Sequence, residues 1–436
     1  MKIQKFGGTS VGSPQRMKDV VNLVRKNERS LVVLSAMSGT TNSLLEIADY
    51  YAKGNKDSAS VMIAKLHAKY NQHIDELYST SEAKDKTRQF LDGIFTKLLS
   101  YSKSAFTPQV QKEIVSFGEI MSTNMVANYF NEIGVKAVLI NAFDFMRTDK
   151  DKEPDLHYLS EHIKPLIEAN NDAQYFITQG FICLNHEDEI DNLQRGGSDY
   201  TASLIGAALK ADVIEIWTDI DGMHNNDPRY VDNTSPVHQL YFEEAAELAY
   251  FGAKILHPTC VLPAKAASVP VKLLNTMEPE AEGTTINNAF QSHAIKAVAA
   301  KDNITAIKIV SSRMLLQTGF LRKVFEIFET FHTPIDMVTT SEVGVSMTID
   351  NTDYFANIVD ELKKYGTVEV DKDMCIICVV GDLRSENTGF ESKITNALRN
   401  VPIRMISYGG SNYNISFLVK QTDKQTALRA LSEELF

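Results

Sequence analysis

The first twelve residues, MKIQKFGGTSVG, combine residue types that bind anions. Residues 3–6 are typical of a short strand carrying Lys5, and Gly7 and Gly8 then let the backbone turn tightly. Ser13 and Pro14 follow as a typical helix start. Backbone N–H groups at a helix N-terminus attract anions, and the Lys5 ammonium adds a positive charge beside them. The spacing matches neither the P-loop nor the dinucleotide-binding motif, so an ordinary strand-turn-helix unit is the alternative.

A second glycine-rich turn, RGGSDYTA at residues 195–202, opens another predicted helix. Arg195 can bind a carboxylate through two parallel N–H bonds. Ser198 adds a hydroxyl group and Asp199 a carboxylate at the same helix mouth. Both residues are also suited to capping the helix, and the two roles are compatible.

Three further stretches carry candidate side chains. Glu119 lies in an otherwise apolar helical face, and because glutamate is seldom buried without a partner, we expect it to face a cleft or to meet a cation. Residues 218–229 (TDIDGMHNNDPR) follow a predicted buried strand, where α/β sheets usually bind ligands, although acidic surface turns have the same composition. Lys254 is either a surface charge or a phosphate contact. The histidines lack metal-ligand spacing, so we expect no metal site within the protein.

Composition restricts the class of protein. The chain has 436 residues and a formal net charge of −12, which argues against nucleic acid or an anionic membrane as a partner. There is no run of 18 apolar residues, and the sequence starts directly with a predicted strand. Cys375 and Cys378 lie inside an apolar run and are interpreted as buried thiols rather than as a redox or metal pair. A reducing, cytoplasmic location is expected.

The first two thirds of the chain alternate between predicted strands and helices. The mainly apolar stretches 31–36, 135–140, 175–182 and 213–217 predict strands, and helical patterns lie between them. This alternation predicts an α/β domain with a mainly parallel sheet.

From about Gly283 onward the sequence repeats itself at an offset of 70 residues. Residues 304–312 match 374–382, and Gly319 matches Gly389 (389 − 319 = 70). Each repeat is predicted to contain the order strand, helix, strand, strand, helix, and the first adds a strand at 367–370. We expect residues 294–299 to supply the equivalent strand of the second repeat, which would interleave the two.

Together these stretches resemble the amino-acid kinase family, and within it the branch that phosphorylates aspartate. The motifs KFGGTSV, LSAMSGTTN, FGE, QGFI, RGGSDYTA, WTDIDG, DPR, FGAKILHP and TTSEVGVS occur in that family's order. The resemblance implies a three-layer α/β sandwich with a mainly parallel sheet over residues 1–290. Two ferredoxin-like (βαββαβ) ACT domains would follow, one at 301–372 and one at 293–300 plus 373–436.

The resemblance implies transfer of the γ-phosphoryl group of ATP, bound with Mg²⁺, to the side-chain carboxylate of L-aspartate. The product would be 4-phospho-L-aspartate, at the first step of lysine, threonine and methionine synthesis. Lys5 and Asp199 match the family's catalytic residues. Positions matching its amino-acid pocket are Ser35, Thr41, Glu119, Phe181, Arg195 and Ser198. Positions matching its nucleotide contacts are Lys5, Gly7, Gly8, Ser10, Thr218, Asp219, His224, Arg229 and Lys254.

In similar enzymes the ACT domains form a homodimer or larger assembly and bind an amino-acid effector at the interface. The matching positions are Met314, Gly319, Phe320, Asp336, Ser341, Glu342 and Val343. Because Asp336 and Glu342 supply two negative charges, lysine is the expected effector and threonine the alternative. A kinase for another acid and a catalytically silent amino-acid sensor are alternative functions, but the presence of Lys5, Glu119, Arg195 and Asp199 favours the enzyme.

Overall fold

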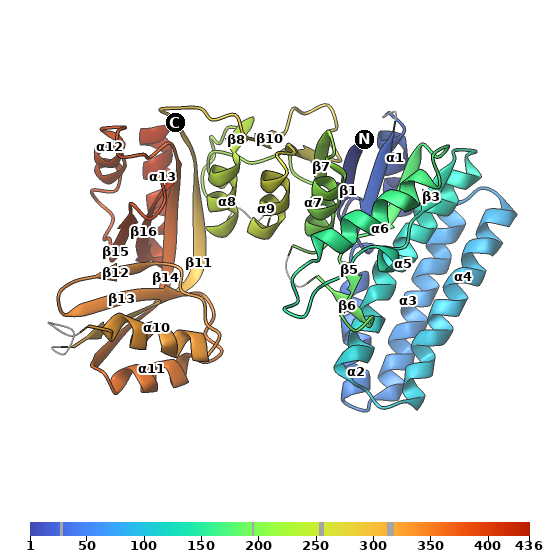
Figure 1. The fold of residues 1–436 in the computed structure, drawn as a ribbon, viewed down its shortest axis with the longest axis horizontal. Helices are drawn as coiled ribbons and strands as arrows, with labels where there is room; N and C mark the ends of the chain where they lie inside the picture. Colours follow the sequence, from blue (N-terminus) through green and yellow to red (C-terminus); the bar gives the residue numbers. More distant parts are fainter. Residues whose placement is uncertain (27–28, 194–195, 253–256, 312–317) are drawn as a thin grey trace. The chain divides into compact units, whose positions relative to one another are not determined.

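The computed structural model describes residues 1–436 except 27–28, 194–195, 253–256 and 312–317 (Figure 1). The chain forms two compact units. The first comprises residues 1–223 and 255–288, and the second comprises residues 224–254 and 289–436. Within the described residues, no helix has both the length and the apolar character needed to cross a membrane.

The first unit is built on a mainly parallel sheet, as the sequence predicts. Its strands are β1 (Lys2–Phe6), β2 (Ser30–Leu34), β3 (Ala137–Leu139), β4 (Tyr175–Gln179), β7 (Val213–Thr218), β9 (Val271–Asn275) and β10 (Thr284–Asn287). They are ordered β3-β4-β2-β1-β7-β9-β10, and only the β9–β10 pair among these neighbours is antiparallel. The strands β2 and β4 are buried along their whole length, which explains their mainly apolar sequences.

Helices cover this sheet, and α1 begins where the sequence predicts a helix start. Ser13 accepts a hydrogen bond from the N–H of Arg16 at the start of α1, and Thr107 caps α5 in the same way through Val110. Gly134, with φ of 72°, follows the end of α5. The helices of this unit are α1 (Pro14–Val24), α2 (Thr40–Ala52), α3 (Lys56–Leu77), α4 (Ser81–Ser100), α5 (Pro108–Glu132), α6 (Leu156–Glu168), α7 (Gly197–Leu209) and α9 (Pro258–Ala266), with short 3₁₀ turns η1 (Tyr101–Lys103) and η2 (Ala142–Asp144).

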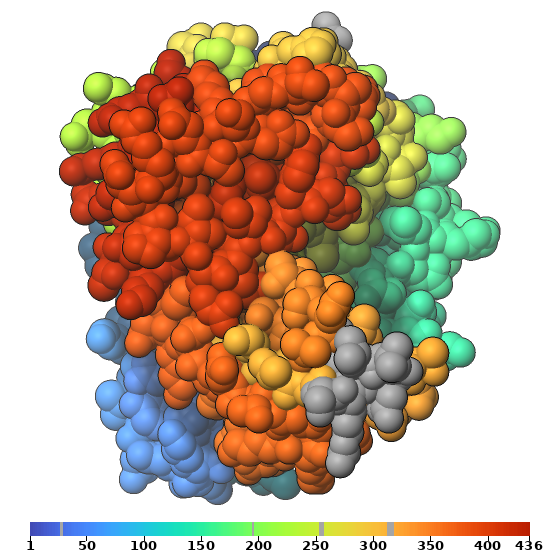
Figure 2. Space-filling model, turned by 90° about the vertical axis from the view of Figure 1, so that its left-hand side faces the viewer, coloured from blue at the N-terminus to red at the C-terminus, as the bar shows by residue number. Residues whose placement is uncertain are grey.

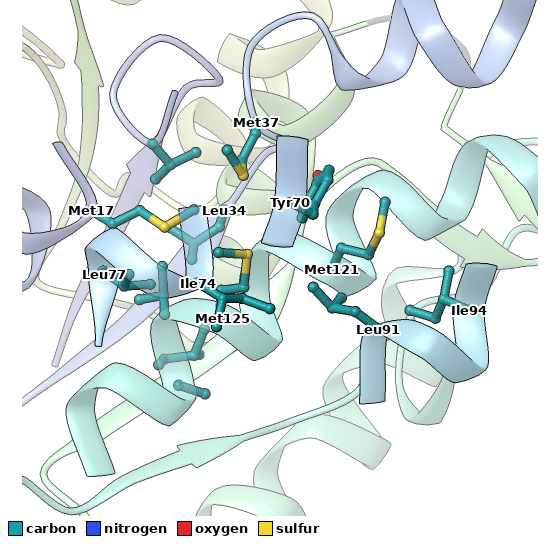
Figure 3. Close-up of a cluster of buried hydrophobic side chains, with 14 of the residues drawn as sticks. Met17, Leu34, Met37, Tyr70, Ile74, Leu77, Leu91, Ile94, Met121 and Met125 are labelled. Atoms are coloured by element: carbon teal, nitrogen blue, oxygen red, sulfur yellow. The ribbon is translucent and has the colours of Figure 1, made fainter. Parts of the chain in front are cut away.

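A methionine-rich core joins α1, α3, α4 and α5 to the carboxyl end of β2. Figure 3 shows Met17, Met37, Met121 and Met125 among the side chains of this cluster. Flexible thioether side chains fill irregular gaps between packed elements. The core therefore fixes α5, the helix that carries Glu119, against the end of β2.

The structure corrects one predicted strand. The predicted strand at 175–182 is shorter in the structure, because β4 ends at Gln179 and a tight turn at Gly180 and Phe181 redirects the chain. A small hairpin of β5 (Ile182–Leu184) and β6 (Ile190–Asn192) follows. Apolar composition alone did not reveal the break, since Phe181 is itself an apolar residue.

The second unit contains the repeated segment and the stretch 224–252. Its elements are β8 (Gln239–Tyr241), α8 (Phe242–Tyr250), β11 (Ile295–Val310), α10 (Phe320–Thr330), β12 (Val338–Thr340), β13 (Gly344–Ile349), α11 (Phe355–Lys363), β14 (Thr367–Gly381), α12 (Phe390–Ala397), β15 (Met405–Tyr408), β16 (Asn414–Lys420), η3 (Gln421–Asp423) and α13 (Lys424–Leu435). The repeat strands form one sheet in the order β12-β13-β11-β14-β16-β15.

The predicted interleaving of the repeats is confirmed by the strand pairing. The first half of β11 pairs with the second half of β14, from Ile295 opposite Gly381 to Lys301 opposite Ile376. The second half of β11 pairs with the first half of β14, from Ala306 opposite Asp371 to Val310 opposite Thr367. Residues 295–299 thus belong to the strand β11, which extends from one repeat into the other with irregular pairing near its middle.

The 70-residue offset is also visible in the backbone. Gly319 and Gly389 both precede a helix in the left-handed conformation, with φ of 86° and 100°. Asn303 and Asp373 both have positive φ at the middle of the two long strands. Figure 2 shows the two repeats as adjoining orange and red areas of the surface of this unit.

Cys375 and Cys378 are fully buried free thiols, as predicted.

Candidate active site

Several chain segments with polar residues meet at one edge of the first unit's sheet. The ends of neighbouring strands lie side by side: Phe6 pairs with Leu34 and with Trp217, the last residue but one of β7, and Leu34 pairs with Gln179. The loops that follow β1, β2, β4 and β7 therefore begin at the same edge. Ligands of open α/β sheets bind at this edge, beyond the carboxyl ends of the strands.

An ion pair joins the two glycine-rich turns at this edge. Lys5, in β1, places its Nζ 2.6 Å from Oδ1 of Asp199 in the first turn of α7. The lysine is 8% exposed and the aspartate side chain 19% exposed, so the pair is shielded but reachable from solvent.

The N-cap of α7 is Gly196, and no side chain forms a capping hydrogen bond there, so the capping role considered for Ser198 and Asp199 is wrong.

The first glycine turn is tightly packed, and some of its backbone N–H groups form hydrogen bonds within the turn. A Cβ on Gly8 would lie 2.8 Å from the carbonyl oxygen of Ala36, so only glycine fits. The N–H groups of Ser10 and Val11 both donate to the carbonyl oxygen of Gly7, which removes them from the expected anion site. A Cβ on Gly7 would lie 3.5 Å from Lys5 Nζ, which places this turn directly beside the ammonium group.

Two hydroxyl pairs connect these loops. Ser35, directly after β2, donates from its Oγ to Oγ of Ser198 over 2.9 Å. A Cβ on Gly180 would lie 2.3 Å from Cβ of Ser198, so the end of β4 and the start of α7 are in direct contact. Oγ of Ser10 lies 2.8 Å from Oγ1 of Thr276 after β9. The predicted pocket residues Ser35 and Ser198 are therefore neighbours.

Glu119 of α5 reaches the same edge from the neighbouring layer. Its carboxylate accepts a hydrogen bond from the N–H of Ala36 through Oε1 at 3.1 Å. The residue is 4% exposed, and Oε2 has no hydrogen-bond partner among the residues that the structure describes. Burial raises the pKa of Glu119 to about 7, although the Ala36 N–H opposes this effect. Such a buried, half-satisfied carboxylate is suited to a cationic group of a ligand.

The other predicted residues of the first unit lie at the ends of its elements. Phe181 occupies the turn after β4 and is half-buried. Thr41 is the second residue of α2 and is also half-buried. Thr218 ends β7, and Asp219 follows it as an exposed residue.

Two residues predicted to contact a nucleotide belong to the second unit. Nδ1 of His224 lies 2.9 Å from Oγ1 of Thr234. Arg229 is 69% exposed and forms a bidentate ion pair with Asp227. Arg195, Lys254 and Met314, which were also predicted to bind ligands, lie outside the described residues.

Comparisons with known proteins agree with this arrangement. The amino acid kinase family matches residues 1–275, and an ACT domain matches residues 377–435. The lysine-sensitive aspartokinase 3 of Escherichia coli (strain K12) is 33% identical over 100% of this chain and 99% of its own length. Aspartokinase 1, chloroplastic, of Arabidopsis thaliana is 34% identical over 100% of this chain and 80% of its own length. The chain belongs to the aspartokinase branch of the amino acid kinase family.

Solved aspartokinase structures share the fold over the whole chain. E. coli aspartokinase III in complex with aspartate and ADP, in its R-state, superposes with a TM-score of 0.86 at 33% identity and covers 100% of both chains. The same enzyme in complex with lysine and aspartate, in its T-state, gives a TM-score of 0.82. The repeats in the second unit are accordingly the ACT domains of an aspartokinase.

The described effector residues predicted for this aspartokinase-family chain lie in separate segments of the first repeat. Gly319 is the N-cap of α10 and Phe320 its first residue. Ser341, Glu342 and Val343 form the exposed turn between β12 and β13, closed by the N–H of Ser341 donating to the carbonyl oxygen of Gly344.

Asp336 has the most complete set of contacts in this group. Its side chain is 1% exposed, and Oδ1 accepts hydrogen bonds from Nζ of Lys301 at 2.7 Å and from the hydroxyl group of Tyr250 at 2.8 Å. Nζ of Lys301 also lies 2.9 Å from Asp350. Burial raises the pKa of Asp336 against the opposing effect of Lys301. Oδ2 has no hydrogen-bond partner among the described residues.

The structure adds positioning contacts that sequence reasoning missed. Thr201 accepts a hydrogen bond from the backbone of Phe181, and Thr276 meets Ser10. Sγ of Cys260 would be 2.5 Å from a Cβ on Gly196, so α9 supports the start of α7. Lys301 and Tyr250 meet at Asp336. These residues are far from their partners in the sequence. Only Thr201 could have been identified from the sequence, because it lies in the RGGSDYTA motif.

Proposed function

We propose that this protein transfers the γ-phosphoryl group of ATP to the side-chain carboxylate of L-aspartate and so forms 4-phospho-L-aspartate and ADP. The observation that carries the proposal is the Lys5–Asp199 ion pair at the carboxyl edge of the sheet, beside the first glycine turn. The 33% identity to an aspartokinase over the whole chain supports the choice of substrate.

The chemistry requires positioning more than proton transfer. An aspartate side chain with a pKa of about 3.9 is already ionised at neutral pH, so it needs no general base. One of its oxygens forms a bond to the γ-phosphorus while the bond from that phosphorus to the β–γ bridging oxygen breaks, and ADP leaves. The obstacle is repulsion between two anions, which positive charge and correct alignment overcome.

Lys5 supplies positive charge for this step. Its ammonium group can stabilise the transferring phosphoryl oxygens, and Asp199 holds it in place over 2.6 Å. Lys254 and Arg229 are proposed to bind the nucleotide, together with Gly7, Gly8, Ser10, Thr218, Asp219 and His224. Mg²⁺ is proposed to arrive bound to the ATP phosphates and to neutralise their charge.

The amino-acid pocket is proposed to bind the α-ammonium and α-carboxylate groups, which aspartate shares with other amino acids. Oε2 of Glu119 can accept a hydrogen bond from the substrate ammonium group, and Arg195 can hold the α-carboxylate. The paired hydroxyl groups of Ser35 and Ser198 lie between the loops after β2 and before α7. Thr41 and Phe181 complete the proposed pocket.

Trapping the acyl phosphate with hydroxylamine tests the proposal. Incubation with ATP, Mg²⁺ and L-aspartate should yield the hydroxamate, whereas L-glutamate, acetylglutamate and carbamate should yield little. Hydroxamate from another acid but not from aspartate would refute the substrate. No product from any acid, combined with measurable amino-acid binding, would favour the alternative of a silent sensor.

We further propose that the ACT domains make the enzyme subject to feedback inhibition by lysine, as a cytoplasmic homodimer or larger assembly at the first step of lysine, threonine and methionine synthesis. Oδ2 of Asp336 is buried and open to an ammonium donor, and the exposed Glu342 offers a second negative charge nearby in the chain. Lysine has two ammonium groups and threonine one. The similarity to the lysine-sensitive aspartokinase 3 of E. coli supports the same effector.

The contacts of Asp336 suggest how such binding could be sensed. Tyr250, the last residue of α8, donates to Asp336, and α8 leads directly into the stretch that contains Lys254. An effector ammonium at Asp336 would compete with Lys301 and would change the environment of Tyr250. Inhibition requires that lysine bind a less active state more tightly than the active one. Initial rates with saturating lysine or threonine test this proposal: inhibition by threonine alone would overturn the effector and keep the regulation.

A further inference from the structure

The turn that ends β4 is strained. The N–H of Ile182 donates to the carbonyl oxygen of Gly180 over 2.7 Å, so the turn spans only three residues. Its central residue, Phe181, has φ of 67°. A γ-turn with positive φ at its centre is the rarer and more strained of the two forms, and an aromatic residue seldom adopts this conformation. Surrounding contacts must therefore hold Phe181 in place.

Thr201 provides the side-chain contact to this turn. It lies in α7, two residues after Asp199, and is completely buried. Its Oγ1 accepts the N–H of Phe181 over 2.9 Å. The carbonyl oxygen of Phe181 accepts the N–H of Leu193 over 2.8 Å, so both backbone polar groups of the strained residue are satisfied.

The same turn shapes the contact between β4 and α7. Gly180 packs on Ser198 so closely that a Cβ would lie 2.3 Å from the serine Cβ. A Cβ on Gly197 would lie 3.7 Å from the ring of Phe181. A change in the turn would therefore move Phe181 and disturb Ser198, which are both residues of the proposed amino-acid pocket.

We propose that Thr201 is a positioning residue for the amino-acid substrate: it holds Phe181 in the strained turn and so fixes the wall of the pocket. This inference rests on the proposed function for its kinetic consequences. Its structural part, the restraint of the turn by the threonine hydroxyl, does not depend on the identity of the substrate.

Thr201→Val removes the hydroxyl group and keeps the shape. Because the buried N–H of Phe181 then loses its acceptor, the variant should raise KM for L-aspartate by about tenfold. Because Thr201 does not contact the reacting groups, kcat should stay within about twofold and KM for ATP should not change. Thr201→Ser keeps the acceptor and should behave like the wild type.

Thr178→Val is the matched control. Thr178 is three residues before Phe181 in β4, is completely buried, and its Oγ1 has no hydrogen-bond partner among the described residues. The same substitution there removes a hydroxyl group without removing a contact, so KM should not change. An equal rise in KM for Thr178→Val, or an equal rise for ATP and aspartate in Thr201→Val, would show a general packing effect and overturn the proposal.

Hydrogen exchange of the substrate-free protein separates this inference from the proposed function. The amide of Phe181 should exchange faster in Thr201→Val than in the wild type or in Thr201→Ser, at equal melting temperature. Unchanged exchange would refute the restraint. Faster exchange in a protein whose wild type makes no acyl phosphate would leave the restraint intact and refute the proposed function alone.

Discussion

The raised pKa of Glu119 predicts how aspartate binding depends on pH. The free carboxyl group titrates at about pH 7 because it is buried, so its ionised fraction rises from about one tenth at pH 6 to about nine tenths at pH 8. The substrate ammonium group stays charged over this range and pairs only with the ionised form. KM for aspartate should therefore fall by about tenfold between pH 6 and pH 8.

Glu119→Gln removes the charge and retains an oxygen that can accept the Ala36 N–H. KM for aspartate at pH 8 should rise by about 10- to 100-fold, the typical value of a hydrogen bond to a charged group, and should no longer vary with pH. KM for ATP should not change. Release of ADP, followed through pyruvate kinase and lactate dehydrogenase, measures both constants at each pH.

Glu113→Gln serves as the control on the same helix, since Glu113 accepts a hydrogen bond from Tyr101 and has no proposed role in the site. This variant should keep the pH dependence of the wild type. Persistence of the tenfold change in Glu119→Gln would refute the proposed ammonium contact.

The same pKa shift has a consequence for stability without substrate. The pKa of Glu119 in the folded chain is about 7, above the ordinary value of 4.5 for a glutamate side chain, so folding favours the protonated form. This contribution, about 3 kcal/mol, is complete below pH 4.5 and is lost as pH rises through 7. Glu119→Gln should therefore be more stable than the wild type at pH 8 and equally stable at pH 4.5, by urea denaturation.

Three other substitutions test the remaining roles. Lys5→Ala should lower turnover by about 100- to 1,000-fold, as expected for loss of a donor to the transition state, with an unchanged circular dichroism spectrum; wild-type turnover would exclude the catalytic role. Arg195→Lys keeps the charge but loses the planar fork, so the dissociation constant for aspartate should rise far more than that for ATP, and equal losses would contradict the assignment. Glu342→Lys should abolish inhibition by lysine, while Glu329→Lys, the same charge change at an exposed position of α10, should leave inhibition unchanged; inhibition that survives in Glu342→Lys would remove Glu342 from the effector site.

Local sequence patterns were sufficient for much of the fold. Mainly apolar stretches predicted the parallel strands, because such strands are buried on both faces. The 70-residue offset predicted that residues 294–299 pair with the second repeat, because a repeated fold with one strand missing needs a donor, and the register from Ile295 to Lys301 confirms it. Glycine-rich turns predicted where Lys5 and Asp199 would lie, because tight turns at strand ends are a local property.

Contacts between distant segments could not be read from such patterns. The break at Phe181 depends on Thr201, twenty residues away, and on the close approach of Ser198 to Gly180. Asp336 was recognised as a charged residue, but its ion pair with Lys301 and its hydrogen bond from Tyr250 are tertiary contacts. The hydrogen bond that Glu119 accepts from the Ala36 N–H likewise joins distant segments and was not indicated by the sequence.

The position of the transferred phosphoryl group is the most direct test of the proposed reaction. Borohydride reduces an acyl phosphate to an alcohol and so records which carboxyl group of aspartate was phosphorylated. After incubation with ATP, Mg²⁺ and L-aspartate, reduction followed by amino-acid analysis should yield homoserine, the product from the side-chain carboxylate, in amounts equal to the ADP formed. Formation of 3-amino-4-hydroxybutyrate, the product from the α-carboxylate, or ADP release without either amino alcohol, would contradict the proposed function.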